Sequence, residues 1–131
     1  MTTDPIADML IRIKNGSKAK KETVLIPYSQ LRFSIAQILL REGYLSSVTK
    51  RLRKASRLLE VGLIYDGNGT PKVTDVERVS KSSKRIYAGV RDVRPVKYGY
   101  GIMVLSTPKG LLTGDEARKE HVGGEVMFKI W

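Results

Sequence analysis

The sequence predicts an α+β protein, in which an N-terminal domain of two helices on a small sheet precedes a mostly β domain with one short helix. Helical and strand periodicities alternate as far as a stretch rich in turn-forming residues, DGNGTP (66–71), and strand patterns dominate after it. Hydrophobic residues make up 41% of the 131 residues, which is enough to bury a core. We therefore expect an N-terminal domain over residues 1–66 and a C-terminal domain over residues 67–131.

The first predicted element is a helix with one apolar stripe. Asp4 is a good N-cap, and Pro5 occupies the first helical position, where its missing N–H costs nothing. The apolar residues at helical spacing are Ile6, Met9, Leu10 and Ile13. We expect Asn15-Gly16 to end this helix.

A strand, a second helix and two further strands are predicted next. TVLIP (23–27) is a short strand, and Ser29 caps a helix that stops at Gly43. The residues expected on the buried side of that helix are Leu31, Ile35, Ile38 and Leu39. YLSSV (44–48) and LLEVGLIY (58–65) are strand-like.

A strongly charged segment, TKRLRKASR (49–57), separates those two strands. It contains no acid, and its five cations are Lys50, Arg51, Arg53, Lys54 and Arg57. We interpret it as a charged turn between paired strands. The plain alternative is a solvated loop that only aids solubility.

The C-terminal domain is predicted to consist mainly of short strands. Strand-like segments are KVTDVERV (72–79), RIYAG (85–89) and GGEVMFKIW (123–131). IMVLS (102–106), which overlaps the longest apolar run GIMVL (101–105), does not alternate, as expected of a strand that is covered on both faces. LLTGDEARKEH (111–121) predicts a short helix that starts near Thr113 or Asp115.

The formal net charge of +11 narrows the classes of partner. A positive field of this size on a small protein most often serves nucleic-acid binding. A membrane is disfavoured, because the sequence has no long basic amphipathic helix and no apolar run of about 18 residues. The absence of cysteine fits a reducing compartment, and MTTDPIADML does not resemble a secretory signal, so we expect a cytoplasmic protein.

Catalytic and metal-binding groups are scarce. The one histidine, His121, lies in a run of charged residues that is typical of a helix end rather than of a general base. Without cysteine or a second histidine a zinc site would need three carboxylates, so we expect no metal and no cofactor. One rival hypothesis is an enzyme using Ser106 with His121, which a third, orienting carboxylate would favour. The other is a general DNA-binding protein, which equal affinity for duplex DNA and structured RNA would favour.

The segment STPKGLLT (106–113) ends the apolar strand with an unusual set of groups. A simple turn needs only Pro108 and Gly110, so Ser106, Thr107 and Lys109 indicate contact with another molecule. Tyrosines could supply stacking surfaces for bases, although core packing with a wet hydroxyl is the more ordinary role of each. These tyrosines are Tyr28, Tyr87, Tyr98 and Tyr100.

STPKGLLT, followed by DEARK and GGEV, resembles the C-terminal signature of the bacterial form of small-subunit ribosomal protein eight. Other segments are similar to that family in the same order: DPIADMLIRIKNG (4–16), IPYSQL (26–31), LREGY (40–44) and RVSKSSKRIY (78–87). The resemblance covers nearly the whole chain. It implies a structural ribosomal protein without enzymatic activity, which binds a helix in the central domain of small-subunit rRNA and helps to assemble the platform of the subunit.

The resemblance also implies partners and a location. Family members repress their own operon mRNA. Small-subunit proteins five and twelve are the neighbours that it implies, with the chain present as a monomer within the ribosome, in the cytoplasm.

The motifs of the family imply which residues contact RNA: Lys14, Arg85, Tyr87, Ser106, Thr107, Lys109, Gly110, Gly123, Gly124 and Glu125. Short hydroxyls suit the shallow minor groove of A-form RNA, and glycines permit close backbone approach. Glu125 is expected to accept hydrogen bonds from base amino groups. The sequence departs from the family pattern at Pro108, which replaces a third loop hydroxyl, and at Ser82-Ser83, where Pro-Gly is common.

Overall fold

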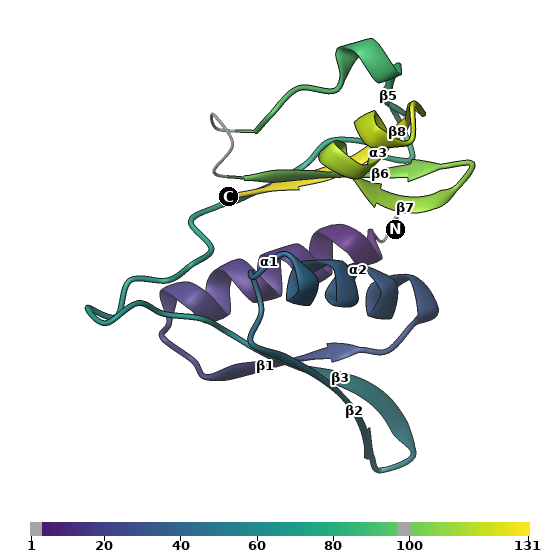
Figure 1. Cartoon of the computed structure of the whole chain (residues 1–131). Helices are drawn as coiled ribbons and strands as arrows, with labels where there is room; N and C mark the ends of the chain where they lie inside the picture. The colour runs from purple at the N-terminus through teal and green to yellow at the C-terminus, as the bar shows by residue number, and fades with distance from the viewer. Residues whose placement is uncertain (1–3, 97–100) are drawn as a thin grey trace. The chain divides into compact units, whose positions relative to one another are not determined.

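The computed structural model describes residues 4–96 and 101–131, which fold into two compact units (Figure 1). The units are Met1–Thr74 and Asp75–Trp131. The first contains two α-helices and a three-stranded sheet, and the second is mostly strand with one short α-helix. The predicted α+β fold class is therefore confirmed. Tyr98 and Tyr100 lie outside the described residues.

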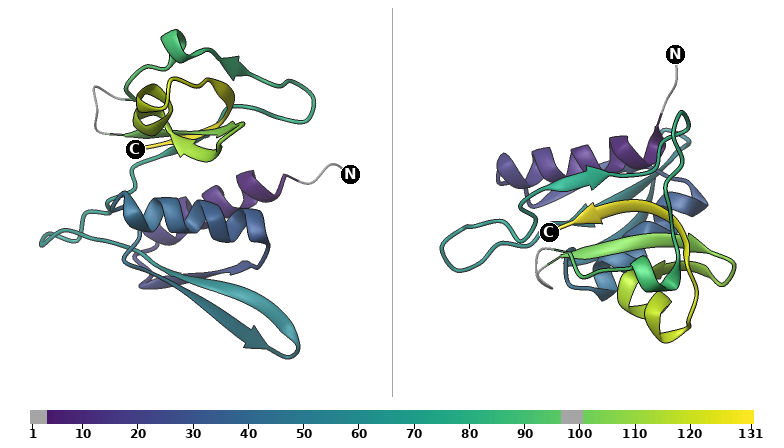
Figure 2. Two further views of the ribbon diagram at one scale, coloured as in Figure 1. Left: turned by 45° about the vertical axis from the view of Figure 1, so that its right-hand side comes forward. Right: turned by 90° about the horizontal axis from the view of Figure 1, so that it is seen from above.

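The first unit is a helical layer on an antiparallel sheet. Its elements are α1 (Pro5–Lys18), β1 (Thr23–Pro27), α2 (Gln30–Arg41), β2 (Ser47–Arg53) and β3 (Ser56–Gly62). The strand order is β1-β3-β2, and both helices lie over the same face of the sheet (Figure 1, Figure 2). Buried apolar residues of the helices meet those of β1 and β3, among them Ile13, Ile35 and Leu59.

Helix α1 extends beyond its predicted end. The helix continues through Gly16 to Lys18, and Gly16 is buried inside it. A Cβ on Gly16 would lie only 2.4 Å from Cγ1 of Val24, so this glycine allows α1 to approach β1 closely. The prediction that Asn15-Gly16 ends the helix was wrong, because the glycine serves packing and Lys20 supplies the left-handed residue after the helix, with φ of 60°.

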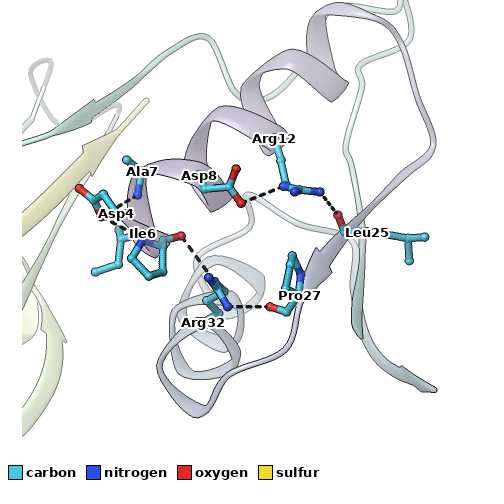
Figure 3. A network of polar contacts seen from close by, with 9 residues as sticks. Asp4, Ile6, Ala7, Asp8, Arg12, Leu25, Pro27 and Arg32 are labelled. Atoms are coloured by element: carbon cyan, nitrogen blue, oxygen red, sulfur yellow. Dashed lines mark hydrogen bonds and ion pairs between the residues drawn. The ribbon is translucent and has the colours of Figure 1, made fainter. Parts of the chain in front are cut away.

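Two arginines connect α1, β1 and α2 through backbone carbonyls (Figure 3). Arg12 pairs with Asp8 at 2.9 Å and also donates to the carbonyl oxygen of Leu25 at 3.2 Å. Arg32 donates to the carbonyl oxygen of Pro27 at 3.2 Å. Part of the positive charge of the first unit therefore holds the unit together.

Helix α2 begins and ends where the sequence predicts. The Ser29 hydroxyl accepts the N–H of Arg32 at 3.1 Å, and Gly43 follows the helix with φ of +84°. Leu31 is 41% exposed, so its predicted burial was wrong. It shares the apolar stripe of Ile35 but lies one turn earlier, at the start of the helix, where less of the unit covers the stripe.

The charged segment 49–57 belongs to strands and not to a loop. β2 and β3 pair without interruption along their whole length, and only Lys54 and Ala55 form the turn between them. Every residue of β2 except Val48 is exposed, and the outer half of the two strands extends beyond the helices (Figure 1). The predicted pairing of the two strands is confirmed, but the predicted extent of the charged turn was wrong. Exposed strand positions keep their cations in solvent while the backbone stays paired.

The turn-rich stretch 66–71 folds back onto the first unit. Tyr65 forms a bridge with Pro71, and the N–H of Lys72 donates to the carbonyl oxygen of Ile64 at 2.9 Å. The division between the two compact units, after Thr74, therefore lies further along the chain than the boundary expected at Asp66. The division into separately folding domains stays a prediction.

The second unit is built around its last strand. Its elements are β4 (Val76–Arg78), β5 (Tyr87–Ala88), the 3₁₀ helix η1 (Val90–Asp92), β6 (Ile102–Thr107), β7 (Gly110–Thr113), α3 (Gly114–Lys119) and β8 (Gly124–Ile130). β8 pairs antiparallel with β4, β5 and β6, and β6 pairs with β7. Val104 and Leu105 are fully buried, as the apolar run predicts, and so is Phe128 of β8. Thr113 caps α3 in a reciprocal arrangement with Glu116.

The turn between β2 and β3 predicts a stabilising substitution. Lys54 and Ala55 have φ of 50° and 65°, which are left-handed values that cost L-residues free energy. Changing them to Asn and Gly, the preferred pair for this kind of two-residue turn, should raise the free energy of unfolding by about 1 to 2 kcal/mol. Thermal unfolding followed by circular dichroism measures the change. Lys54→Gln removes the same charge and should give no such gain; equal melting temperatures for all three proteins would contradict the prediction.

Candidate nucleic-acid interface

One end of the β5–β8–β6–β7 sheet brings together most of the residues predicted to bind RNA. Tyr87 of β5 lies opposite Glu125 of β8, and Glu125 lies opposite Ser106 of β6. We define the candidate surface as Arg85, Tyr87, Ser106, Thr107, Lys109, Gly110, Gly123, Gly124 and Glu125. Lys14 is the exception, because it is a half-buried residue of α1 in the first unit.

The two neighbouring hydroxyls of β6 have different environments. The Thr107 hydroxyl donates to the carbonyl oxygen of Gly110 at 2.8 Å and accepts the N–H of Lys109 at 3.1 Å. It therefore closes the turn between β6 and β7. Ser106 is exposed, and its hydroxyl makes no hydrogen bond within the described residues, so it can donate to and accept from a ligand.

Gly110 is required by the turn and leaves its surroundings open. Its φ is +102°, a value that L-residues with side chains rarely adopt, and a Cβ there would meet nothing within 4 Å. Lys109 pairs with Glu120 at 3.0 Å, and both side chains are about half exposed. An exposed pair of this kind contributes little free energy, so an anionic ligand could take over the ammonium group at small cost.

Gly123 and Gly124 are needed for contacts inside the protein. A Cβ on Gly123 would lie 2.3 Å from the carbonyl oxygen of Ala88, and a Cβ on Gly124 would lie 2.2 Å from that of Ser106. The strands on both sides of β8 therefore approach these glycines too closely for any side chain. Packing within the protein therefore accounts for both glycines, and the expectation that the pair also admits an RNA backbone stays a prediction.

Glu125 is held by two side chains. Its Oε2 accepts from the Ser80 hydroxyl at 2.5 Å and from the Arg85 guanidinium at 2.9 Å, and its side chain is only 15% exposed. The Ser80 hydroxyl, followed by the Arg85 pair, lowers the pKa of Glu125 below its ordinary value of 4.5. The carboxylate is therefore ionised at neutral pH, and one oxygen is already used within the protein.

This network orders the basic segment that precedes β5. Ser80 is fully buried, and its hydroxyl also accepts the N–H of Ile86 at 3.0 Å. Lys81 and Lys84, which lie between Ser80 and Ile86 in the sequence, form a β-bridge with each other. The backbone of the segment is therefore held both by this bridge and by the Ser80 hydroxyl. Ser80 was missed in the sequence, because a serine in a polar run carries no signal of burial. Tyr87, directly after this segment, is 70% exposed and offers a ring face to solvent.

The geometry does not assemble the rival catalytic site. No hydrogen bond joins Ser106 and His121 in the part of the chain that the structure describes. His121 is exposed, and with φ of 55° it ends α3 as a left-handed residue. Across residues 4–96 and 101–131, no group of three or more potential metal-binding side chains gathers. Within the same ranges, the helices are too short or too polar to cross a membrane.

Comparison with known proteins identifies the family. A family described as Ribosomal protein S8 matches residues 4–131. The small ribosomal subunit protein uS8 of Mycoplasmopsis agalactiae is 47% identical over 129 residues, which cover 98% of each chain. The uS8 proteins of Solibacter usitatus and Persephonella marina are 41% and 44% identical, and in both cases the whole of each chain is covered.

Fold, charge and relatives together define a structural protein of the small ribosomal subunit. The chain belongs to the ribosomal protein S8 family. The resemblance seen in the sequence is thereby confirmed, and with it a place in the small ribosomal subunit and a structural role in place of an enzymatic one.

Close packing at the start of β8 predicts the effect of a single methyl group. Gly124→Ala places a Cβ against the Ser106 carbonyl and should lower the free energy of unfolding by about 1 to 3 kcal/mol or more. Trp131, the only tryptophan, packs against the core of the second unit, so its fluorescence in urea reports this loss. Gly67→Ala is the matched control, because a Cβ there meets nothing within 4 Å. Similar unfolding midpoints for both variants would contradict the prediction.

The lowered pKa of Glu125 predicts a pH dependence. A carboxyl group whose folded pKa is depressed contributes stability above its unfolded pKa and loses it as the pH falls through the folded value. Glu125→Gln should therefore be less stable than the wild type at neutral pH, and the difference should shrink as the pH falls below 4.5. Urea unfolding followed by Trp131 fluorescence measures it. Glu120→Gln, at an exposed pair, should change little, and a difference for Glu125→Gln that persists unchanged in acid would contradict the assignment.

Proposed function

We propose that the candidate surface binds a helix in the central domain of small-subunit rRNA and so helps to assemble the platform of the subunit. The observation that carries this proposal is the row of Tyr87, Glu125 and Ser106 across three strands, in which Tyr87 and Ser106 are exposed. Membership of a family of small-subunit proteins makes rRNA the nucleic acid to test.

The groups in this row suit the minor groove of A-form RNA. That groove is wide and shallow and displays 2′-hydroxyls and base edges, which short donors and acceptors can reach. Among the residues that the structure describes, the Ser106 hydroxyl has no partner, and the open space at Gly110 lets a sugar-phosphate backbone come close. The exposed Tyr87 offers a stacking surface for an unpaired base.

Glu125 has a different role in this proposal from the one that the sequence suggested. Because Oε2 holds Ser80 and Arg85, the carboxylate mainly positions the basic segment before β5. Arg85 remains half exposed and can still meet a phosphate. Oε1 is the oxygen left to accept from a base amino group.

Phosphate contacts supply the second part of the binding energy. Lys109 and Arg85 belong to the candidate surface, and Lys81 and Lys84 lie on the exposed segment beside it. Each phosphate neutralised by such a cation adds about 0.7 to 0.9 to the log–log slope of affinity against salt. Binding should accordingly weaken steeply as salt is added.

Three finer points belong to the same proposal. Small-subunit proteins five and twelve are the expected protein neighbours, with the chain present once in the subunit. The same surface would bind an operon mRNA that mimics the rRNA helix and so repress translation. Lys14 of α1 would add a phosphate contact from the first unit.

The environments of Ser106 and Thr107 make the proposal testable. Ser106→Ala removes an exposed hydroxyl that the fold does not use, so RNA affinity should fall roughly tenfold while the melting temperature stays unchanged. Thr107→Val removes two hydrogen bonds of the turn, so its melting temperature should fall. Filter binding to the isolated rRNA helix and thermal unfolding measure the two effects.

Controls separate recognition from folding. Thr107→Ser keeps the hydroxyl and should restore most of the stability lost in Thr107→Val. Duplex DNA of equal length should bind more weakly than the rRNA helix, since it lacks the 2′-hydroxyls. If the Ser106→Ala protein binds the rRNA helix as tightly as the wild type does, the proposed role of the loop is wrong.

A further inference from the structure

The two strands that carry the charged segment form an arm of unusual composition. We call the paired strands β2 and β3, with their turn, the β2–β3 ribbon. Its cations are Lys50, Arg51, Arg53, Lys54 and Arg57, and Glu60 is the only acid between Ser47 and Gly62. That acid pairs with Arg51 at 3.0 Å, which leaves a large excess of positive charge along the outer half of the ribbon.

Aromatic rings hold two of these cations. The Lys50 ammonium lies 4.4 Å from the ring centre of Phe33 and 5.5 Å from that of Tyr28. The Arg57 guanidinium lies 4.8 Å from the ring centre of Tyr28. A ring fixes a cation without neutralising it, so these charges remain available to an anion.

The tip of the ribbon carries two exposed cations. Arg53 and Lys54 are exposed, and neither side chain has a polar partner among the described residues. Their strands stay paired up to a turn of only Lys54 and Ala55, so the tip is presented on a short, ordered hairpin. Nothing in the core of the first unit requires charge at these positions, because the helices do not cover this half of the ribbon.

The distribution of cations on the ribbon is typical of a surface that binds a polyanion and not of one that binds a protein. Neighbouring side chains of a strand point to opposite faces, so the cations project from both faces of the ribbon as well as from its tip. Protein interfaces concentrate exposed aromatic and apolar groups. Here Leu52 is the one large apolar side chain that is strongly exposed, at 74%, and the nearby rings are covered by Lys50 and Arg57.

We propose that the β2–β3 ribbon is a second RNA-binding site, which contacts phosphates of the rRNA at a place separate from the helix bound by the candidate surface. The inference rests on the proposed function, because it assumes that the chain binds rRNA. Two sites on one chain raise the effective concentration of the second contact once the first has formed. The ribbon would therefore add affinity for a large rRNA domain and little for the isolated helix.

Two RNAs and two matched variants test this site. Arg53→Gln with Lys54→Gln removes the charges at the tip and should weaken binding to the whole central domain, while binding to the isolated helix stays close to that of the wild type. If each lost cation met one phosphate, the log–log salt slope for the central domain should fall by about 1.4 to 1.8. Lys18→Gln with Lys21→Gln removes the same charge from exposed positions outside the ribbon and should leave that slope nearly unchanged.

A tethered probe locates the contact directly. The chain has no cysteine, so Ser56→Cys provides a unique attachment point for an iron chelate beside the tip. Hydroxyl radicals released there should cleave the central domain at positions that the isolated helix does not contain. Asn68→Cys, on another exposed turn of the first unit, is the control and should cleave other positions.

The outcomes distinguish this inference from the proposed function. Failure of the wild type to bind either RNA would overturn both. Normal binding with an unchanged salt slope in the tip variant, or equal loss in the tip and control variants, would overturn only the second site. Unchanged RNA binding combined with lost attachment of an acidic small-subunit protein would assign the ribbon to that protein and would also overturn the inference.

Discussion

The close approach of three backbones at the start of β8 is the constraint on which the candidate surface depends. Gly123 and Gly124 allow β5 and β6 to lie directly against this strand, with no room for a methyl group. Tyr87, Glu125 and Ser106 thereby share one row across the sheet, although about 40 residues separate the first two in sequence. The glycines act through the fold, and the groups that meet solvent are the side chains that they align.

At this end of the sheet, some polar atoms stabilise the fold and neighbouring polar atoms stay available to a ligand. Thr107 closes the turn with both of its hydrogen bonds, whereas the Ser106 hydroxyl has no partner in residues 4–96 and 101–131. Glu125 uses one oxygen to hold Ser80 and Arg85 and so orders the segment that carries Lys81 and Lys84. A surface organised in this way meets a ligand with little reordering, which lowers the entropic cost of binding.

The cations behind the net charge of +11 also have two kinds of role: some bind groups of the protein itself, and others project into solvent. Arg12 and Arg32 bind backbone carbonyls and connect the elements of the first unit. Lys50 and Arg57 lie over aromatic rings, and Arg53 and Lys54 project from the ribbon tip. Total charge therefore indicates a polyanionic partner, whereas only the surroundings of each cation show which ones are available to it.

The sequence by itself determined the fold class, the N-caps of α1 and α2, the buried strand β6 and the loop that follows it. Helix caps, hydrophobic period and turn residues can do so because they act over a few neighbouring positions. The sequence could not determine the roles of Gly16, Ser80 and the charged segment 49–57. Each depends on a partner far away in the chain: Val24 packs against Gly16, Glu125 accepts from Ser80, and β3 pairs with the cations of β2. Local sequence patterns do not depend on such distant contacts. Only the tertiary structure therefore decided that Gly16 serves packing, that Ser80 is buried and that the basic run belongs to two paired strands.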